Sequence, residues 1–237
     1  MNLSIAYTNS SALRGRCEVT AARHTHHEPG YENGAVVPAG PWRAISAQEA
    51  RTLRPTALTD DARLIELIKL PGHLPGALPQ LADNLGDPNA SYLGQAASSA
   101  NALTTTENYT DGRRIGLHVD NWDKLSYTTK HQGRRRLCVN LGPGTRYLLV
   151  GATDIQSICR AMHQNPEQRY PHTDDLRAYV AARQPLLIYR LRLAPGEGYL
   201  APTELLPHDG STQDQPHPSA AAFWLGRWPC GVLPSLV

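Results

Sequence analysis

Residues Arg134–Val150 read RRRLCVNLGPGTRYLLV, and this stretch decides the expected fold class. Two short apolar runs, Leu137–Leu141 and Tyr147–Val150, lie on either side of a Gly-Pro-Gly sequence at residues 142–144. Short runs rich in Leu, Val and Tyr that are bounded by Gly and Pro are typical of β-strands. The stretch therefore predicts two strands with a tight turn between them.

Similar runs recur through the second half of the chain and are separated by turn residues. They cover Ile115–Asp120, Leu186–Leu193, Gly198–Leu200 and Ala222–Arg227. Many short strands without a regular alternation of strand and helix favour a sandwich or a barrel. The 19 Gly and 19 Pro support this interpretation, because both residues interrupt helices. We therefore expect a mainly β protein with helical additions.

Residues 1–100 are expected to be a helical and irregular front. Ser46 is a good N-cap for a helix over residues 47–53. A second helix is predicted over residues 59–70, because Leu and Ile recur there with helical spacing. Residues 71–89 are rich in Pro and Gly, which predicts a connecting segment or a lid.

Two further helices are expected inside the β-rich part, residues 101–237. One is predicted over residues 153–164 and the other over residues 173–184, because each begins with a capping residue and an acidic first turn. They form a helical insertion at residues 153–184. No clean linker divides the chain, so we expect a single domain.

Composition excludes several classes of protein. The chain has 237 residues, of which 23 are basic and 21 acidic, so its field does not favour nucleic acid as a partner. No apolar stretch approaches the roughly 18 residues of a membrane helix, and no secretory signal is expected. Four widely spaced cysteines predict free thiols and a cytoplasmic location. The run Arg134–Arg136 predicts a solvated turn with one Arg facing inward.

The sharpest chemical signal is Leu117–His118–Val119–Asp120. In a strand, residues two apart point to the same face, so His118 and Asp120 are expected to project together. One imidazole and one carboxylate make up two-thirds of the set of two His and one carboxylate that holds non-haem Fe(II) with open positions.

Two further signals follow along the chain. A turn and a strand-like run over residues 195–207 lead to His208, where Asp209 and Gly210 turn the chain. Arg227 is expected to share a strand face with apolar side chains, and a charged group in that position requires an anion.

In this order, His118-x-Asp120, His208 and Arg227 resemble the iron(II)/2-oxoglutarate-dependent dioxygenases. The surrounding sequences LHVDNWDK, RRRLCVNLGPGTRYLLV and PGEGYLAPTELLPHDGST resemble bacterial members that act on amino acids or tailor natural products. The resemblance covers about residues 110–227. It implies a double-stranded β-helix core, which is also described as a jelly-roll or cupin-like fold.

The resemblance also implies the roles of individual residues. His118, Asp120 and His208 are expected to ligate Fe(II), with 2-oxoglutarate and O₂ as cosubstrates and succinate and CO₂ as products. Arg227 is expected to anchor the far carboxylate of 2-oxoglutarate. The family often has a hydroxyl residue two places later, where this chain has Pro229. A second contact is therefore expected from Asn140, Thr145 or Tyr147.

Substrate contacts are expected on both sides of the ligands. Asn121, Trp122 and Asp123 follow the ligand pair and are expected to line the mouth of the site. Thr203 and Glu204 precede His208, and the Glu204 carboxylate is expected to hold a substrate ammonium or guanidinium.

One alternative concerns the ligand set: His217 lies ten residues before Arg227 and is a rival to His208. His208 is preferred, because it follows a strand-like run whereas His217 stands between two prolines. Asp120 occupies the place that a small residue takes in related halogenases, which implies hydroxylation, desaturation or epoxidation.

The expected substrate is a small amino-acid-like, peptidyl or natural-product molecule. Two other functions stay open: a cupin metalloenzyme that does not use 2-oxoglutarate, and a non-catalytic jelly-roll binding protein.

Overall fold

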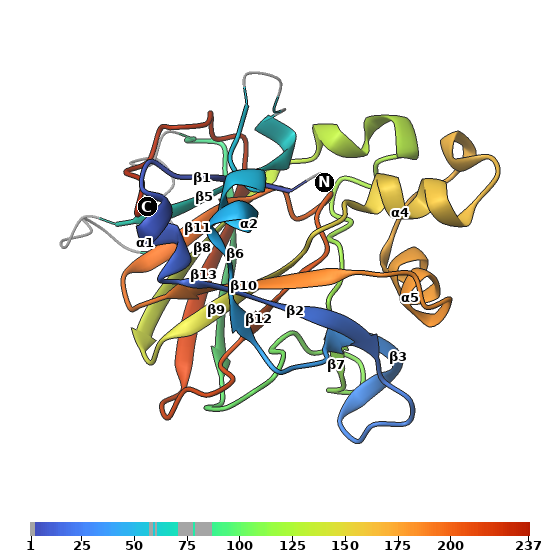
Figure 1. The fold of residues 1–237 in the computed structure, drawn as a ribbon, viewed down its shortest axis with the longest axis horizontal. Coiled ribbons are helices and arrows are strands. Elements are labelled where there is room, and N and C mark those ends of the chain that lie inside the picture. The colour runs from blue at the N-terminus through green and yellow to red at the C-terminus, as the bar shows by residue number, and fades with distance from the viewer. Residues whose placement is uncertain (1–2, 57–58, 60, 71–77, 79–86) are drawn as a thin grey trace.

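The computed structural model describes residues 3–56, 59, 61–70, 78 and 87–237, and its framework consists of two β-sheets (Figure 1). The first sheet has the strand order β1 (Ser4–Ala6), β5 (Leu64–Lys69), β11 (Glu197–Ala201), β8 (Arg135–Pro143), β13 (Ser219–Gly226) and β6 (Ser91–Ser98). The second has the order β12 (His208–Ser211), β9 (Arg146–Gly151), β10 (Leu187–Leu193), β2 (Cys17–His24), β3 (Tyr31–Pro38) and β7 (Arg114–Gly116), with β4 (Arg43–Ala44) beside β2. The predicted mainly β class is confirmed.

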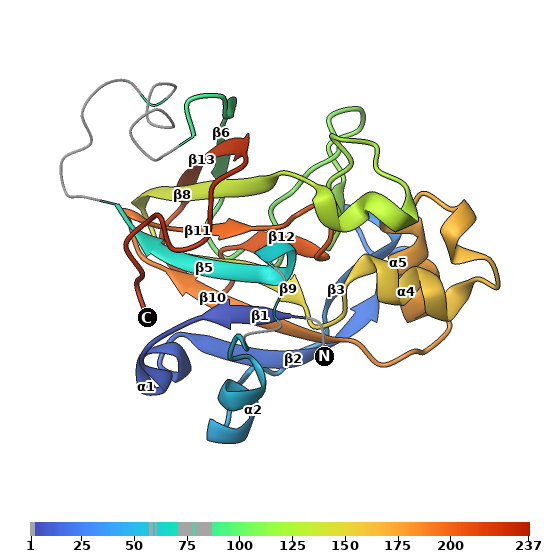
Figure 2. The same cartoon turned by 90° about the horizontal axis from the view of Figure 1, so that it is seen from above.

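From β6 onward the chain passes repeatedly between the two sheets. Strands β6, β8, β11 and β13 belong to the first sheet, and β7, β9, β10 and β12 belong to the second. The turn at residues 142–144 therefore carries the chain from one sheet to the other. Figure 2 shows β8, β11 and β5 of the first sheet above β10 and β2 of the second.

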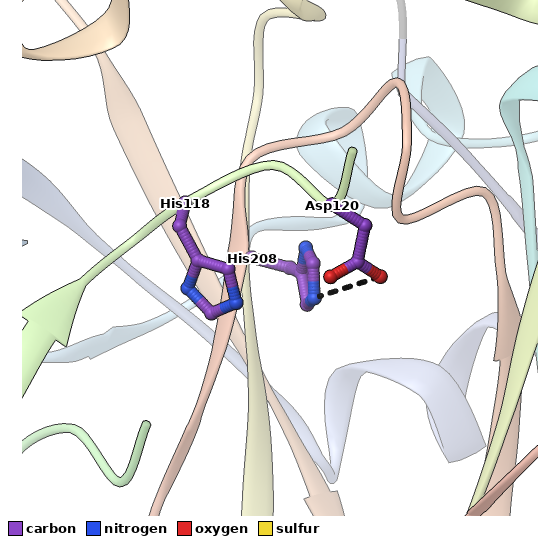
Figure 3. A group of neighbouring side chains, drawn as sticks. All are labelled: His118, Asp120 and His208. Atoms are coloured by element: carbon purple, nitrogen blue, oxygen red, sulfur yellow. Dashed lines mark ion pairs between the residues drawn. The ribbon is translucent and has the colours of Figure 1, made fainter. Parts of the chain in front are cut away.

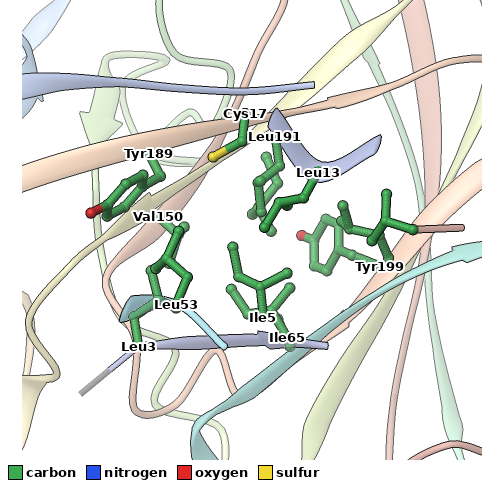
Figure 4. Close-up of a cluster of buried hydrophobic side chains, with 14 of the residues drawn as sticks. Leu3, Ile5, Leu13, Cys17, Leu53, Ile65, Val150, Tyr189, Leu191 and Tyr199 are labelled. Carbon is green, nitrogen blue, oxygen red and sulfur yellow. The ribbon is translucent and has the colours of Figure 1, made fainter. Parts of the chain in front are cut away.

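The main hydrophobic core lies between the sheets, as Figure 4 shows. Ile65 on β5 and Tyr199 on β11 face Val150 on β9 and Leu191 on β10, and all four are at most 5% exposed. Alternate residues of facing strands point inward in such a packing, and burial of each large side chain stabilises it by about 1.5–3 kcal/mol.

The second sheet almost closes on itself. Its ordered path begins at β12 and ends at β7, and an antiparallel bridge between His118 and His208 joins these two ends. The closure places both histidines at one seam of the sheet.

The expected helical and irregular front contains strands that were not predicted. Residues 1–100 include strands β1–β6, and the helices there are short: α1 (Ser10–Arg14) and α2 (Ala47–Thr52). Helix α2 is the predicted one, and Ser46 and Glu49 cap it reciprocally. The front is therefore part of both sheets.

The helix predicted over residues 59–70 is a strand. A short 3₁₀ turn at residues 61–63 leads into β5, which pairs with β1 and β11. Five of the six residues of β5 are buried, so both faces of the strand are covered. A short apolar run of this kind occurs in buried strands and in buried helices, and the periodicity of the sequence alone does not distinguish the two. Most of the predicted lid, residues 71–89, lies outside the described residues.

Helices α4 (Ile155–Met162) and α5 (Thr173–Ala181) confirm the two predicted in the insertion. Asp154 caps α4, whereas His172 caps α5 one residue before the expected start. Both helices contribute to a second hydrophobic cluster with residues of the second sheet and of the segment after β7. Among the described residues, no helix is long and apolar enough to cross a membrane.

Candidate metal centre and adjoining cavity

His118 and His208 face each other across the seam of the second sheet. The amide of His118 donates to the carbonyl of His208 at 3.0 Å, and the reverse bond is 2.8 Å long. Residues directly opposite in an antiparallel bridge present their side chains on the same face. The two imidazole centroids are accordingly 4.6 Å apart. Figure 3 shows both histidines with Asp120.

Asp120 joins the histidines through its own backbone contact. Strand β7 ends at Gly116, so the predicted strand over residues 115–120 is shorter than expected, and the Asp120 amide donates to the Thr203 carbonyl at 2.9 Å. Its Oδ2 lies 3.9 Å from His208 Nε2. One ligand atom from each of the three side chains lies within 4.8 Å of the others, and all three residues are buried.

The rival histidine lies elsewhere. His217 is exposed in the loop between β12 and β13, whereas His208 is 3% exposed and points toward the other two ligands (Figure 3). The geometry therefore favours His208 as the third member of the cluster.

Backbone carbonyls orient both imidazoles. His118 Nδ1 lies 2.9 Å from the Gly116 carbonyl, and His208 Nδ1 lies 3.1 Å from the Leu206 carbonyl. A carbonyl only accepts, so each Nδ1 carries the proton and each Nε2 is left for a metal. Burial lowers the pKa of His208 to about 3, so this ring is neutral and its Nε2 lone pair is available.

Asp120 is held in its charged form. Burial raises the pKa of this carboxyl group, but the opposing effects of Arg136, His208 and His118 outweigh burial and leave the pKa below its ordinary value. Arg136 Nη2 lies 2.7 Å from Asp120 Oδ2. The cluster thus combines two oriented imidazoles and one carboxylate, the donor set of non-haem Fe(II) sites.

A cavity of about 320 Å³ adjoins the cluster on the side of His208. Arg136, Arg146, Tyr199 and Phe223 are among the residues that line it. Its volume lies at the lower end of small-molecule sites. The cavity therefore suits a small ligand beside the candidate metal position.

Arg146 is the unusual residue of this cavity. It is 4% exposed, it forms no ion pair with any described residue, and its Nη1 has no hydrogen-bond partner among them. A buried guanidinium without a counter-ion is costly, and an anion in the cavity would offset that cost. Arg146 was not among the candidate residues, because the expected strand began only at Tyr147.

The position of Arg227 does not support its expected role as the anchor of 2-oxoglutarate. This residue is exposed and does not line the cavity; its Nη1 donates to the Gln132 carbonyl at 3.3 Å. Strand β13 ends at Gly226, and its pairing with β6 shifts between Phe223 and Trp224. The alternation that would have put Arg227 on the face of Phe223 therefore does not continue to it.

Of the three proposed second contacts, only Tyr147 lines the cavity. Its hydroxyl accepts from Gln215 Nε2 at 2.9 Å. Asn140 instead holds the turn after β8, since its Nδ2 donates to the carbonyls of Gly144 and Leu193. Thr145 is half-buried in that turn, away from the cavity lining.

The three residues after Asp120 do not line the cavity either. Asn121 and Trp122 are exposed. Asp123 forms an ion pair with Arg134 at 2.7 Å. Because the chain leaves the strand before these residues, they lie on the outer side of the cluster, and their predicted substrate contacts are not supported by the cavity.

Thr203 and Glu204 also have structural partners. Thr203 binds the backbone of Asp120, as described above. Glu204 is 1% exposed, and its Oε2 lies 2.8 Å from Lys130 Nζ. Residues 203–205 form a turn, so the strand alternation that would place Glu204 beside His208 fails. The prediction that Glu204 holds a substrate is therefore not supported.

Lys130 connects the segment that carries Asp120 with the turn that precedes His208. This role of Lys130 was not predicted from the sequence. Its ammonium group contacts the Asp120 carbonyl at 3.3 Å and the Glu204 carboxylate, and the side chain is fully buried. All three arginines of the basic run that follows form ion pairs at 2.7 Å: Arg134 with Asp123, Arg135 with Glu66 and Arg136 with Asp120, and the last two are the more deeply buried. Two of its three arginines thus face inward, where one was expected.

Lys130→Met is expected to lower the free energy of unfolding by about 3–5 kcal/mol, because it leaves the Glu204 carboxylate buried and unpaired. Denaturant unfolding measures this loss. Arg134→Met, which breaks a partly exposed pair with Asp123, is the matched control and should cost less than about 1 kcal/mol. Equal losses in the two variants would contradict the assignment.

Gly116→Ala is expected to disturb the position of His118. Gly116 has φ +73°, and a Cβ atom there would lie 2.5 Å from the Val36 carbonyl oxygen. Gly112 has φ +71° but open space around it, so Gly112→Ala isolates the backbone cost of about 1–2 kcal/mol. Gly116→Ala should cost about 3 kcal/mol and also weaken any metal binding at the cluster. Unfolding and Fe(II) titration measure both effects, and indistinguishable variants would refute the prediction.

Comparison with protein-family models finds no match for this chain, and comparison with curated proteins finds no relative.

Proposed function

We propose that this protein is an iron(II)/2-oxoglutarate-dependent oxygenase. The observation that carries the proposal is the combination of the buried cluster of His118, Asp120 and His208 with Arg146, which lines the adjoining cavity and has no counter-ion among the residues that the structure describes. A metal bound by the cluster and an anion bound by Arg146 would thus share one small chamber.

The strand order supports the finer fold proposal. From β6 to β13 each strand lies in the other sheet from the one before it, except that β9 and β10 are neighbours in the second sheet. The bridge between His118 and His208 joins the chain after β7 to β12. Four strands in each sheet then follow the arrangement of a double-stranded β-helix, the jelly-roll that the resemblance implies.

The residues present fit Fe(II). His208 Nε2 is buried without a hydrogen-bond partner among the described residues, and a metal would satisfy this atom. The three ligands would occupy one face of the ion and leave positions for a bidentate cosubstrate and O₂. Arg136 would hold the carboxylate oxygen of Asp120 that faces it, and so orient this ligand.

Arg146 replaces Arg227 as the proposed anchor of 2-oxoglutarate. Of the two arginines that line the cavity, Arg136 is paired with Asp120, whereas Arg146 forms no ion pair with a carboxylate in the described part of the chain. Its guanidinium can bind the far carboxylate of 2-oxoglutarate in bidentate fashion. Tyr199 also lines the cavity, and its hydroxyl group could contact the same carboxylate. The keto and near carboxylate groups would then point toward the metal.

When bound together, iron, 2-oxoglutarate and O₂ would supply oxidative decarboxylation to succinate and CO₂ with oxidation of a substrate C–H bond. The protein's contribution is placement and exclusion of water. The carbonyls of Gly116 and Leu206 hold the ring protons on Nδ1 and leave Nε2 toward the metal. Phe223 contributes an apolar ring to the cavity wall. The centroid of this ring lies 5.6 Å from the guanidinium carbon of Arg136.

The proposed substrate is a small amino-acid-like or natural-product molecule, because a cavity of about 320 Å³ must also admit the cosubstrate. Asp120 keeps the carboxylate ligand, which favours hydroxylation, desaturation or epoxidation over halogenation.

Succinate formation tests the proposal. Protein with Fe(II), O₂ and 2-oxoglutarate should release succinate, and a panel of amino acids and their derivatives should raise that rate for a matching substrate. A chelator and His118→Ala should each abolish it. Succinate release that survives His118→Ala, or its absence across the panel despite tight Fe(II) binding, would contradict the proposal and favour a metalloenzyme that does not use 2-oxoglutarate.

A further inference from the structure

A second group of metal-ligating side chains lies where α4 meets α5, outside the cavity described above. Cys159 and His163 stand one helical turn apart at the end of α4, and Asp175 lies in the first turn of α5. Figures 1 and 2 both show the two helices side by side at one end of the molecule. One ligand atom from each residue lies within 4.8 Å of the others.

The local sequence explains this meeting. Residues four apart on a helix share a face, so Cys159 and His163 both point toward α5. Asp175 is held by the cap of α5: its Oδ2 accepts from the His172 amide at 3.1 Å. Its Oδ1 lies 2.6 Å from His163 Nε2. The carboxylate therefore presents one oxygen to its own helix and the other to α4.

The position of Cys159 is not explained by the contact between His163 and Asp175 alone. A hydrogen bond between His163 and Asp175 would link the helices without it. Yet the thiol is fully buried beside this pair, and no described residue forms a hydrogen bond with it. Burial, and after it the negative charge of Asp175, raises the pKa of Cys159 to about 11, so the thiol keeps its proton when no metal is present.

We propose that Cys159, His163 and Asp175 form a Zn²⁺ site that fastens α4 to α5. Thiolate, imidazole and carboxylate are the ligands that Zn²⁺ takes in proteins. Binding releases the thiol proton, and the charges of thiolate and carboxylate then cancel that of the ion, which suits a buried site.

Access to the site is on the side of His163, whose side chain is 27% exposed, and a water molecule there would complete four-fold coordination. Arg169 approaches Asp175 Oδ1 at 3.7 Å, but its side chain is 47% exposed and can turn to solvent when the ion binds.

The site would also support the segment that bears the other ligands. Thr173, at the start of α5, accepts a hydrogen bond from the Val119 amide at 3.3 Å, between His118 and Asp120. A clamp at Asp175 would hold this turn of α5 in place. The inference itself does not depend on the oxygenase activity, because it rests on a separate group of residues.

Cobalt substitution tests the proposal. Thiol-reduced, chelator-treated full-length protein is titrated with Co²⁺. A near-ultraviolet charge-transfer band from thiolate to cobalt is expected, and only a site with a cysteine ligand gives it. The band should disappear in Cys159→Ser and persist in His118→Ala, which removes a ligand of the other cluster. Cys230→Ser, at a partly exposed thiol, is the matched control and should keep the band.

His163→Ala provides a second test at a partly exposed position. It should weaken Zn²⁺ binding by about a hundredfold, measured by competition with a chromophoric chelator, and should reduce the rise in melting temperature that Zn²⁺ produces in the unaltered protein. No thiolate band at saturating Co²⁺, a band that survives Cys159→Ser, or unchanged Zn²⁺ affinity in His163→Ala would overturn the proposal.

Discussion

Replacing His208 by Ala is expected to abolish Fe(II) binding at the cluster and succinate release together. The change removes one of the three protein ligands and leaves a cavity beside a charged Asp120. Loss of a residue that only supports a ligand lowers metal affinity by up to about a hundredfold, so loss of the ligand itself should lower Fe(II) affinity by more than that. Anaerobic Fe(II) titration and succinate assay measure the two effects.

His217→Ala is the matched control for this result. His217 is the rival ligand from the same part of the sequence, and it is exposed on its loop, so the variant should bind Fe(II) and form succinate normally. An inactive His217→Ala beside an active His208→Ala would show that the ligand assignment is wrong. Circular dichroism of both variants separates loss of the ligand from loss of the fold.

Replacing Arg146 by Met is expected to raise the 2-oxoglutarate concentration required for half-maximal succinate release by about 150-fold. The estimate corresponds to about 3 kcal/mol, within the cost of truncating one partner of a buried, hydrogen-bonded charge pair. Met keeps much of the volume of the side chain, so the walls of the cavity should remain in place. Fe(II) affinity without cosubstrate should stay unchanged, because Arg146 forms no hydrogen bond or ion pair with His118, Asp120 or His208.

Arg227→Met is the control for Arg146. Both changes remove one guanidinium group, but Arg227 is exposed and outside the cavity lining, so its loss should leave 2-oxoglutarate dependence unchanged. If Arg227→Met instead raised the requirement for 2-oxoglutarate and Arg146→Met did not, the anchor proposed from the sequence would be right and the one proposed from the cavity wrong.

The contrast between Arg146 and Arg227 shows which parts of the candidate site can be predicted from the sequence. The proximity of His118 and Asp120 was expected from a spacing of two residues in a strand, but β7 ends before both residues, and long-range backbone bonds to His208 and Thr203 position them. The approach of His208 was suggested by a resemblance, and the backbone bridge to His118 supplies the physical reason. Arg227 lies outside the cavity because β13 ends at Gly226 and its pairing with β6 shifts, and the alternation of residues along the sequence does not reveal these tertiary properties.

Other differences have the same origin. The apolar run in β5 has the composition of a buried helix stripe, and only its position between β1 and β11 makes it a central strand. Glu204 was expected to hold a substrate cation, but a turn directs it to Lys130, which lies 74 residues away in the chain. A partner so distant in sequence leaves no local pattern, so the ion pair was not predictable.

The most direct measurement is the visible spectrum of the protein with Fe(II) and 2-oxoglutarate in the absence of oxygen. A weak charge-transfer band is predicted that requires both additions, disappears in His208→Ala and returns in Arg146→Met only at much higher 2-oxoglutarate. Fe(II) binding at the cluster without any such band at saturating 2-oxoglutarate would contradict the account.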